Sequence, residues 1–210
     1  MNIYVFGDSV AFGKYDSKGG WVARLVEFLE TKYLANETDE FFVYNLSISG
    51  NHSADILARF DDEIKLRLSE KRNSMVIFAT GLNDSAFVRS QNRHWVDLQK
   101  FQENLRRLIS RARQYAGRII FIGLAPTDEK IVDPMPWDTD KSYRNEYVKK
   151  YDCALAEAAR DGDVDYISLY GKFIAADHKK LLHDGAHPSA AGHQLIFETV
   201  RDYLLEQKII

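Results

Sequence analysis

The sequence predicts an α/β domain in which a five-stranded parallel sheet lies between two layers of helices. The first observation is that short runs of β-branched and aromatic residues alternate with longer segments of helical periodicity. The second is that small, polar, glycine-bearing junctions follow the first three of these runs. The third is the length, because 210 residues fit one domain that spans residues 1–210 and buries a core of sufficient size.

Five apolar runs are expected to form the strands, and helical segments are expected between them. The strands are predicted at residues 2–6, 41–45, 75–80, 118–122 and 164–168. In the intervening segments apolar residues recur every three or four positions, which is the spacing of a helix with one buried face. These stripes are Trp21, Val22, Leu25, Val26 and Leu29; Trp95, Leu98, Phe101, Leu105, Leu108 and Ile109; Tyr147, Tyr151, Leu155 and Ala158; and Leu195, Ile196, Val200 and Leu204. A more charged helix from residue 54 to about 71 has a narrower stripe of Ile56, Phe60, Ile64 and Leu68.

The charge and cysteine content argue against several classes of function. Subtracting 31 acidic from 28 basic residues leaves a net charge of −3, which argues against nucleic acid or an anionic membrane surface as the main partner. Cys153 is the single cysteine, so no intramolecular disulfide and no CxxC motif can form, and we expect it to face the core of a helix. The first apolar run is too short for a secretory signal and no run of about 18 apolar residues occurs, so we expect a cytoplasmic protein without membrane insertion.

The junctions that follow the predicted strands are the places to look for chemistry, because ligands bind at the carboxyl ends of parallel strands. The first three junctions are residues 7–10 (Gly-Asp-Ser-Val), 47–51 (Ser-Ile-Ser-Gly-Asn) and 81–84 (Gly-Leu-Asn-Asp). Their glycines allow a backbone amide to come close to a reacting oxygen. The junction after the fourth strand, residues 124–140, is long and contains proline, and we expect an ordered loop at the rim of the site.

An aspartate and a histidine three residues apart, Asp184 and His187, precede the last predicted helix. In a glycine-containing loop the carboxylate of Asp184 can bind Nδ1 of His187 and leave Nε2 free as a base. The hydroxyl that this base would deprotonate is that of Ser9, at the mouth of the first strand. Residue types alone leave two other interpretations open: Asp8 and Ser9 as a polar turn and helix cap, and His187 as a solvated loop histidine.

Taken together and in this order, these residues resemble the SGNH, or GDSL-like, hydrolase family. Residues 7–10 resemble the first block of that family, with Val10 in place of the usual leucine. Gly50 is similar to the glycine of the second block, residues 81–84 fit the third block (Gly-x-Asn-Asp), and the aspartate and histidine described above fit the last. The four blocks span residues 7–187. No Gly-x-Ser-x-Gly elbow is present, which disfavours the α/β-hydrolase fold.

The resemblance implies a three-layer α/β/α sandwich with the flavodoxin-like SGNH hydrolase fold. It implies that Ser9 is the nucleophile, His187 the general base and Asp184 the residue that orients the base. The oxyanion hole would consist of the backbone N–H groups of Ser9 and Gly50 and the side-chain amide of Asn83. The chemistry agrees, because a tetrahedral intermediate needs two or three fixed donors at its oxygen.

Two aspartates and two serines near these blocks have competing interpretations. Asp8 and Asp84 could form a carboxylate pair for acid–base work or magnesium binding, but we expect them to brace the turns on which the serine and asparagine of the site lie. Ser47 and Ser49 are rival hydroxyls, and we expect them to satisfy local backbone groups.

Three histidines, at positions 183, 187 and 193, fall within eleven residues and could suggest zinc. Their separations of four and six residues do not place all three on one regular face, and neither a second cysteine nor a His-Glu-x-x-His motif is present. We therefore predict no metal and no organic cofactor.

The rim of the expected site supplies the candidate substrate-binding residues, Phe87, His94 and Trp137. Trp95 lies nearby but also fits a helix stripe, and we expect that role for it. Between residues 125 and 140 five acidic residues stand against one lysine. We expect this acidic rim to disfavour a strongly anionic substrate.

The function expected from the sequence is that of a serine esterase or acylhydrolase, which cleaves a small-molecule carboxylic ester or thioester through an acyl-enzyme on Ser9. The alternative is a non-catalytic domain that keeps the fold and binds a carbohydrate or an acyl group. The presence of all four blocks argues against that alternative, because binding alone needs no nucleophile, base and oxyanion donors together.

Overall fold

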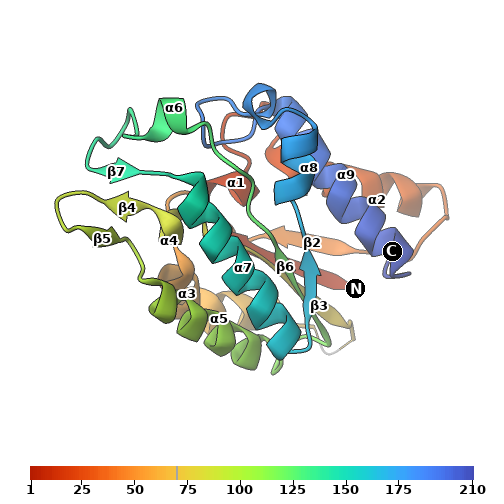
Figure 1. Ribbon diagram of the computed structural model, residues 1–210. Helices are drawn as coiled ribbons and strands as arrows, with labels where there is room; N and C mark the ends of the chain where they lie inside the picture. The colour runs from red at the N-terminus through yellow and green to blue at the C-terminus, as the bar shows by residue number, and fades with distance from the viewer. Residues whose placement is uncertain (70) are drawn as a thin grey trace.

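A five-stranded parallel sheet forms the centre of the computed structural model, which describes residues 1–69 and 71–210 (Figure 1). The strands lie in the order β2-β1-β3-β6-β8. Their bounds are β1 Asn2–Gly7, β2 Phe42–Asn45, β3 Ser74–Ala79, β6 Arg118–Ile122 and β8 Asp165–Ile167. The predicted parallel sheet is confirmed, with each strand end within two residues of its expected position.

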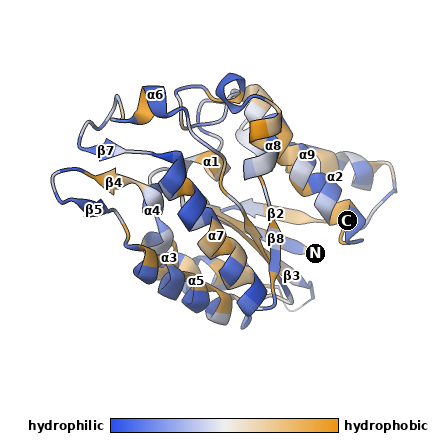
Figure 2. Cartoon of the chain, viewed as in Figure 1, coloured by the Kyte–Doolittle hydropathy of each residue, from blue (hydrophilic) through white to orange (hydrophobic). Residues whose placement is uncertain are grey.

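Helices cover both faces of the sheet (Figure 1). On one face lie α2 (Gly20–Leu34) and α9 (Ala190–Glu206), and on the other lie α3 (Ser53–Lys65), α5 (Leu98–Ala112) and α7 (Asn145–Asp161). Figure 2 shows apolar and polar residues alternating around α5 and α7, as expected for helices with one buried face.

The strand β1 shows why the sheet needs helices on both faces. Tyr4 and Phe6 point into the core on the side of α3, α5 and α7, whereas Ile3 and Val5 point into the core on the side of α2 and α9. All four side chains are fully buried. Because successive side chains of a strand point to opposite faces, an unbroken apolar run requires burial on both sides.

Short elements gather at the carboxyl edge of the sheet. They are α1 (Ser9–Phe12), α4 (Leu82–Ser85), α6 (Glu129–Val132), α8 (Tyr170–Ala175) and the 3₁₀-helix η1 (His178–Leu181). A second, antiparallel sheet has the order β5-β4-β7, with bounds β4 Phe87–Val88, β5 Arg93–His94 and β7 Lys141–Ser142. The sequence did not predict these elements, because two to six residues are too few for a periodic signal.

The helix expected from residue 54 to about 71 is shorter than its periodicity suggested. α3 ends at Lys65, Leu68 is 42% exposed, and Glu70 lies outside the described residues. Beyond the helix, the carbonyl of Arg67 accepts hydrogen bonds from the Tyr4 hydroxyl (2.7 Å) and the Asn2 amide (3.3 Å). These bonds tie the chain to β1 where the helical pattern would have continued.

Two side chains lie elsewhere than the helical stripes indicated. Cys153 is exposed on α7 and does not face the core. The buried face of that helix includes Val148, Tyr151 and Leu155, and a residue two positions after Tyr151 points away from it. Trp95 precedes α5 and is half-buried outside any helix.

Within the described part of the chain, none of the helices combines the length and the apolar character that a membrane span requires.

Candidate active site

The site lies where β1 and β3 meet, which is the point at which the strand order reverses along the sheet. β1 ends at Gly7, and Ser9 is the first residue of α1. A Cβ at Gly7 would lie 2.7 Å from both the Ala11 Cβ and the Ala79 carbonyl oxygen, so only glycine fits there. Asp8 caps α1 by accepting a hydrogen bond from the Val10 N–H (2.9 Å). This turn places the Ser9 hydroxyl at the carboxyl edge of the sheet.

The loop that precedes α9 brings a histidine to this serine. His187 Nε2 lies 2.9 Å from Ser9 Oγ, and His187 Nδ1 lies 2.8 Å from Asp184 Oδ2. The other carboxylate oxygen of Asp184 accepts the backbone N–H groups of Ala186 (3.1 Å) and His187 (2.9 Å). Gly185, which follows Asp184 directly, has φ +89°, a conformation that favours glycine. The structure thus brings together three residues that the sequence separates by up to 178 positions.

The hydrogen bonds in this loop keep Asp184 ionised and set the tautomer of His187. Partial burial alone would raise the pKa of Asp184, but the hydrogen bonds that it accepts from the His187 ring and backbone lower its pKa to about 2. An ionised carboxylate only accepts hydrogen bonds, so Nδ1 of His187 holds the proton. In the neutral ring, Nε2 is then the acceptor that faces the Ser9 hydroxyl.

Gly50 and Asn83 line the same pocket as Ser9 and His187. Gly50, in the loop between β2 and α3, has φ +87°. Asn83, in α4, donates from Nδ2 to the carbonyl oxygen of Asn51 (2.9 Å). The pocket has a volume of about 220 Å³. Its other lining residues are Lys14, Ser49, Trp95, Met135, Trp137, Asp138, Lys141 and Tyr143.

Two buried carboxylates support the turns beneath the site. Asp84 accepts hydrogen bonds from both the backbone N–H and the hydroxyl of Ser53, which joins α4 to the start of α3. Asn104 of α5 donates to the same hydroxyl (2.9 Å). Burial raises the pKa of Asp84, and burial raises the pKa of Asp8 to about 7. Both aspartates thus hold local structure, as the sequence suggested.

The two serines of the loop after β2 differ from expectation. The hydroxyl of Ser47 is buried and has no hydrogen-bond partner among the described residues, although its backbone N–H donates to Asn45 Oδ1 (3.2 Å). Ser49 is exposed and lines the pocket. Neither hydroxyl therefore satisfies a local backbone group.

Of the three candidate substrate-binding residues, only Trp137 is among those lining the pocket. Its indole ring is 5.7 Å from the His187 ring, and the residue is 48% exposed. Phe87 and His94 form a cross-strand pair of the small sheet and pack against Tyr147, with ring centroids 5.9 and 4.6 Å from it. Their assignment to the pocket is corrected, because this pairing directs both rings toward α7.

Part of the expected acidic rim forms ion pairs with basic residues in the fold. Asp133 accepts hydrogen bonds from Arg89 (2.6 Å) and Arg144 (2.8 Å), and Asp138 lies 3.0 Å from the Lys141 ammonium. The pocket itself is lined by Asp138 and by two lysines, Lys14 and Lys141. These ion pairs offset part of the negative charge that a local count gives, because such a count omits partners that only folding supplies. That the rim disfavours a strongly anionic substrate stays a prediction.

The other two histidines near the end of the chain, His183 and His193, contact different partners. His183 stacks on Tyr15, with ring centroids 4.6 Å apart, while His193 is buried in α9 with Nε2 3.5 Å from the Lys14 carbonyl oxygen. Within residues 1–69 and 71–210, His, Cys, Asp and Glu side chains do not gather in groups of three or more that could hold a metal ion.

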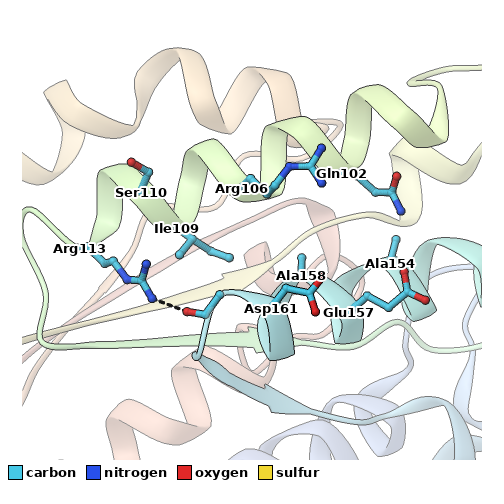
Figure 3. A pocket seen from close by; sticks show the side chains of 10 residues that line it. Gln102, Arg106, Ile109, Ser110, Arg113, Ala154, Glu157, Ala158 and Asp161 are labelled. Atoms are coloured by element: carbon cyan, nitrogen blue, oxygen red, sulfur yellow. Dashed lines mark hydrogen bonds between the residues drawn. The ribbon is translucent and has the colours of Figure 1, made fainter.

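A second hollow, of about 270 Å³, lies between α5 and α7 (Figure 3). Arg106 lines it from α5, Arg113 from the residue that follows α5, and Glu157 and Asp161 from α7. Arg113 donates to the carbonyl of Gly162, as Figure 3 shows. Its lining includes none of the residues of the four blocks, so it is separate from the site at Ser9.

Comparison with known proteins identifies the family. The model of the GDSL-like Lipase/Acylhydrolase family matches residues 5–195. The chain belongs to this family. Two relatives carry esterase names: "Esterase TesA" of Pseudomonas aeruginosa is 26% identical over 95% of this chain and 86% of its own length, and "Isoamyl acetate-hydrolyzing esterase 1 homolog" of Bos taurus is 26% identical over 99% and 82%. The family and enzyme class predicted from the sequence are confirmed.

Solved structures with the same fold include two acetylxylan esterases. Axe2 of Geobacillus stearothermophilus has a TM-score of 0.74 at 22% identity, covering 98% of this chain and 93% of its own. AlAXEase has a TM-score of 0.75 at 20% identity, covering 97% and 100%. Catalytic mutants of Axe2, with alanine replacing a serine, a histidine or an aspartate, have also been solved. These likenesses confirm the predicted SGNH fold for this GDSL-like chain.

Proposed function

We propose that this GDSL-like protein is a serine esterase that cleaves a small carboxylic ester or thioester through an acyl-enzyme on Ser9. The observation that carries the proposal is the position of His187, whose two ring nitrogens lie 2.9 Å from Ser9 Oγ and 2.8 Å from Asp184 Oδ2. A hydroxyl is a weak nucleophile until a base removes its proton, and a base works best when a third group fixes its tautomer. A polar turn or a solvated loop histidine needs neither contact.

The reaction proceeds in two halves. In the first, Ser9 Oγ forms a bond with the acyl carbon while its proton moves to His187 Nε2. The bond to the leaving oxygen or sulfur then breaks, and Nε2 returns the proton to that leaving group. In the second half, water attacks the acyl carbon as His187 takes its proton, and the acid leaves as Ser9 regains its hydrogen.

The negative oxygen formed in each half needs donors, and we assign this role to the backbone N–H groups of Ser9 and Gly50 and to the side-chain amide of Asn83. Ser9 is the first residue of α1, where backbone N–H groups have no partner within the helix. Gly50 lines the pocket with its backbone in the left-handed region. Asn83 uses one hydrogen of its amide for the Asn51 carbonyl, so the second hydrogen is free for the substrate. Pre-arranged donors of this kind typically contribute ~10²- to 10³-fold each to the rate.

The relatives support an ester as substrate. The names of the bacterial and bovine relatives both include an esterase, and the bovine name specifies isoamyl acetate hydrolysis. In Axe2 the mutated aspartate and histidine are three positions apart, as Asp184 and His187 are in this chain.

The first experiment measures hydrolysis of a short-chain aryl ester by the wild type and by Ser9→Ala, together with labelling by a fluorophosphonate. We expect the substitution to abolish both turnover and labelling. Hydrolysis at the wild-type rate by Ser9→Ala would remove the serine from the mechanism. A wild-type protein that binds esters or sugars but neither hydrolyses nor becomes labelled would favour the non-catalytic binding domain instead.

The second experiment concerns the oxyanion hole. Asn83→Ala is expected to lower kcat by ~10²- to 10³-fold with little change in melting temperature. Loss of folding without a specific kinetic defect would instead mean that Asn83 only braces α4. A panel of esters that varies acyl length and leaving group then identifies the preferred substrate.

A further inference from the structure

We propose that Tyr143 is a positioning residue for the reaction, because its hydroxyl fixes the side-chain amide of Asn83 so that one N–H points into the pocket. This inference rests on the proposed function, in which Asn83 donates to the oxyanion. Tyr143 lies between β7 and α7 and belongs to none of the four blocks. Its role is additional to that of the groups that touch the substrate.

The contact itself sets the orientation of the amide. The Tyr143 hydroxyl donates to Asn83 Oδ1 at 2.7 Å, and Asn83 Nδ2 donates to the Asn51 carbonyl oxygen at 2.9 Å. A carbonyl oxygen only accepts hydrogen bonds, so Nδ2 is the atom that must face Asn51. If the amide rotated by half a turn, its oxygen would face that carbonyl oxygen, and neither atom could donate. The Asn51 carbonyl therefore selects the orientation of the amide, and the Tyr143 hydroxyl holds the amide in that orientation from the other side.

The surroundings of Tyr143 keep its hydroxyl in the donating form. The residue is 5% exposed, and its backbone N–H donates to the Val132 carbonyl (3.0 Å), which anchors it to the end of α6. Burial and the nearby carboxylates, beginning with Asp8, raise the pKa of the phenol far above its ordinary value of 10. The phenol thus stays protonated throughout the pH range in which an esterase is assayed.

The same bonds connect the two donors of the proposed oxyanion hole. Asn51 follows Gly50 directly, so the bond from Asn83 to the Asn51 carbonyl holds the glycine loop against α4. The Asn51 side chain is held in turn by the Arg59 guanidinium of α3 (3.0 Å). Fixing the amide of Asn83 from the opposite side, as Tyr143 does, therefore limits the motion of both donors. A small displacement of a donor costs much of its effect on the transition state.

The test is Tyr143→Phe, which removes the hydroxyl and keeps the ring. On a short-chain aryl ester we expect kcat to fall roughly 10-fold while KM changes less than about twofold. The reason is that Asn83 Oδ1 loses the Tyr143 hydroxyl as its donor, so the amide is no longer held in the orientation that the transition state needs. The inhibition constant of an aryl boronic acid, whose serine adduct places an oxygen in the hole, is expected to rise in parallel. A matched control is Tyr4→Phe, since the hydroxyl of Tyr4 is also buried and donates to the carbonyl of Arg67 (2.7 Å), beyond the far end of α3. The control is expected to lose stability but to keep its kcat.

A double-mutant cycle separates positioning from a structural role. If Tyr143 acts through Asn83, adding Tyr143→Phe to Asn83→Ala causes no further loss of kcat. A tenfold loss in both backgrounds, or an unchanged kcat in Tyr143→Phe, overturns the positioning role and leaves the serine mechanism intact. If Asn83→Ala itself keeps its kcat, the oxyanion assignment and this inference fail together, whereas Ser9→Ala still reports separately on the nucleophile.

Discussion

The buried carboxyl group of Asp8 should make the stability of the protein fall as pH rises, and Asp8→Asn should remove that dependence. Burial raises the pKa of Asp8 from 3.8 to about 7 in the folded state. Between these pH values the folded chain holds a proton that the unfolded chain has released. The free energy of unfolding therefore decreases with increasing pH in this window, and the contribution of Asp8 is largest below pH 4.

The magnitude follows from the two pKa values. At about 1.4 kcal/mol for each pKa unit, the change from 3.8 to about 7 corresponds to about 4 kcal/mol between pH 4 and pH 8. Asparagine resembles the protonated acid in shape, and its Oδ1 can accept the Val10 N–H as Asp8 does. We therefore expect the variant to match the wild type near pH 4 and to exceed its stability near pH 8.

The assay is urea unfolding of both proteins at a series of pH values, with the difference in unfolding free energy plotted against pH. Taking the difference cancels most of the contribution of other titrating groups, such as Asp184, whose lowered pKa acts in the opposite direction. A difference that stays flat from pH 4 to pH 8 would refute the reasoning, because it would mean that Asp8 ionises in the folded state as readily as in the unfolded one.

Three further outcomes are expected from substitutions around the pocket. Asp184→Asn should lower kcat by a factor on the order of 10⁴, as in the Ser-His-Asp template, because the amide no longer holds Nδ1 of His187 protonated. Steady-state kinetics should show this loss with little change in KM, and a loss of kcat below tenfold would contradict the role of Asp184. Trp137→Ala should raise KM roughly 3- to 10-fold without altering the melting temperature, whereas Ile174→Ala, at 49% exposure against 48% for Trp137, should change neither quantity. Gly50→Ala meets open space but keeps φ near +87°, so it should cost about 1 kcal/mol in thermal unfolding and also lower kcat; a variant as stable and active as the wild type would show that the left-handed conformation is not needed there.

The sequence predicted the main strands and the blocks of the site well, because both depend on local features. A strand buried on both faces is a continuous apolar run, and the turns at Gly7, Gly50 and Gly185 need glycine for close approach or positive φ. The early end of α3 was missed because helical periodicity carries no information on the hydrogen bonds that residues of β1 make to the following segment. The exposure of Cys153 was missed because a residue two positions from the buried Tyr151 lies on the opposite side of the helix. Phe87 and His94 were expected at the pocket because strands of two residues leave no periodic pattern in the sequence, so their pairing in the small sheet was not foreseen.

The α/β class, the membership of the GDSL-like family and the identity of the residues in the four blocks follow from the order of the amino acids alone. The other side chains that surround these residues are set by the fold. Tyr143 reaches Asn83 across 60 positions of the chain, and the acidic loop finds its arginines 11 and 44 positions away. Hydrogen bonds and ion pairs depend on distances in space of about 3 Å. Such distances between remote segments exist only after the sheet has brought the carboxyl ends of its strands to one edge.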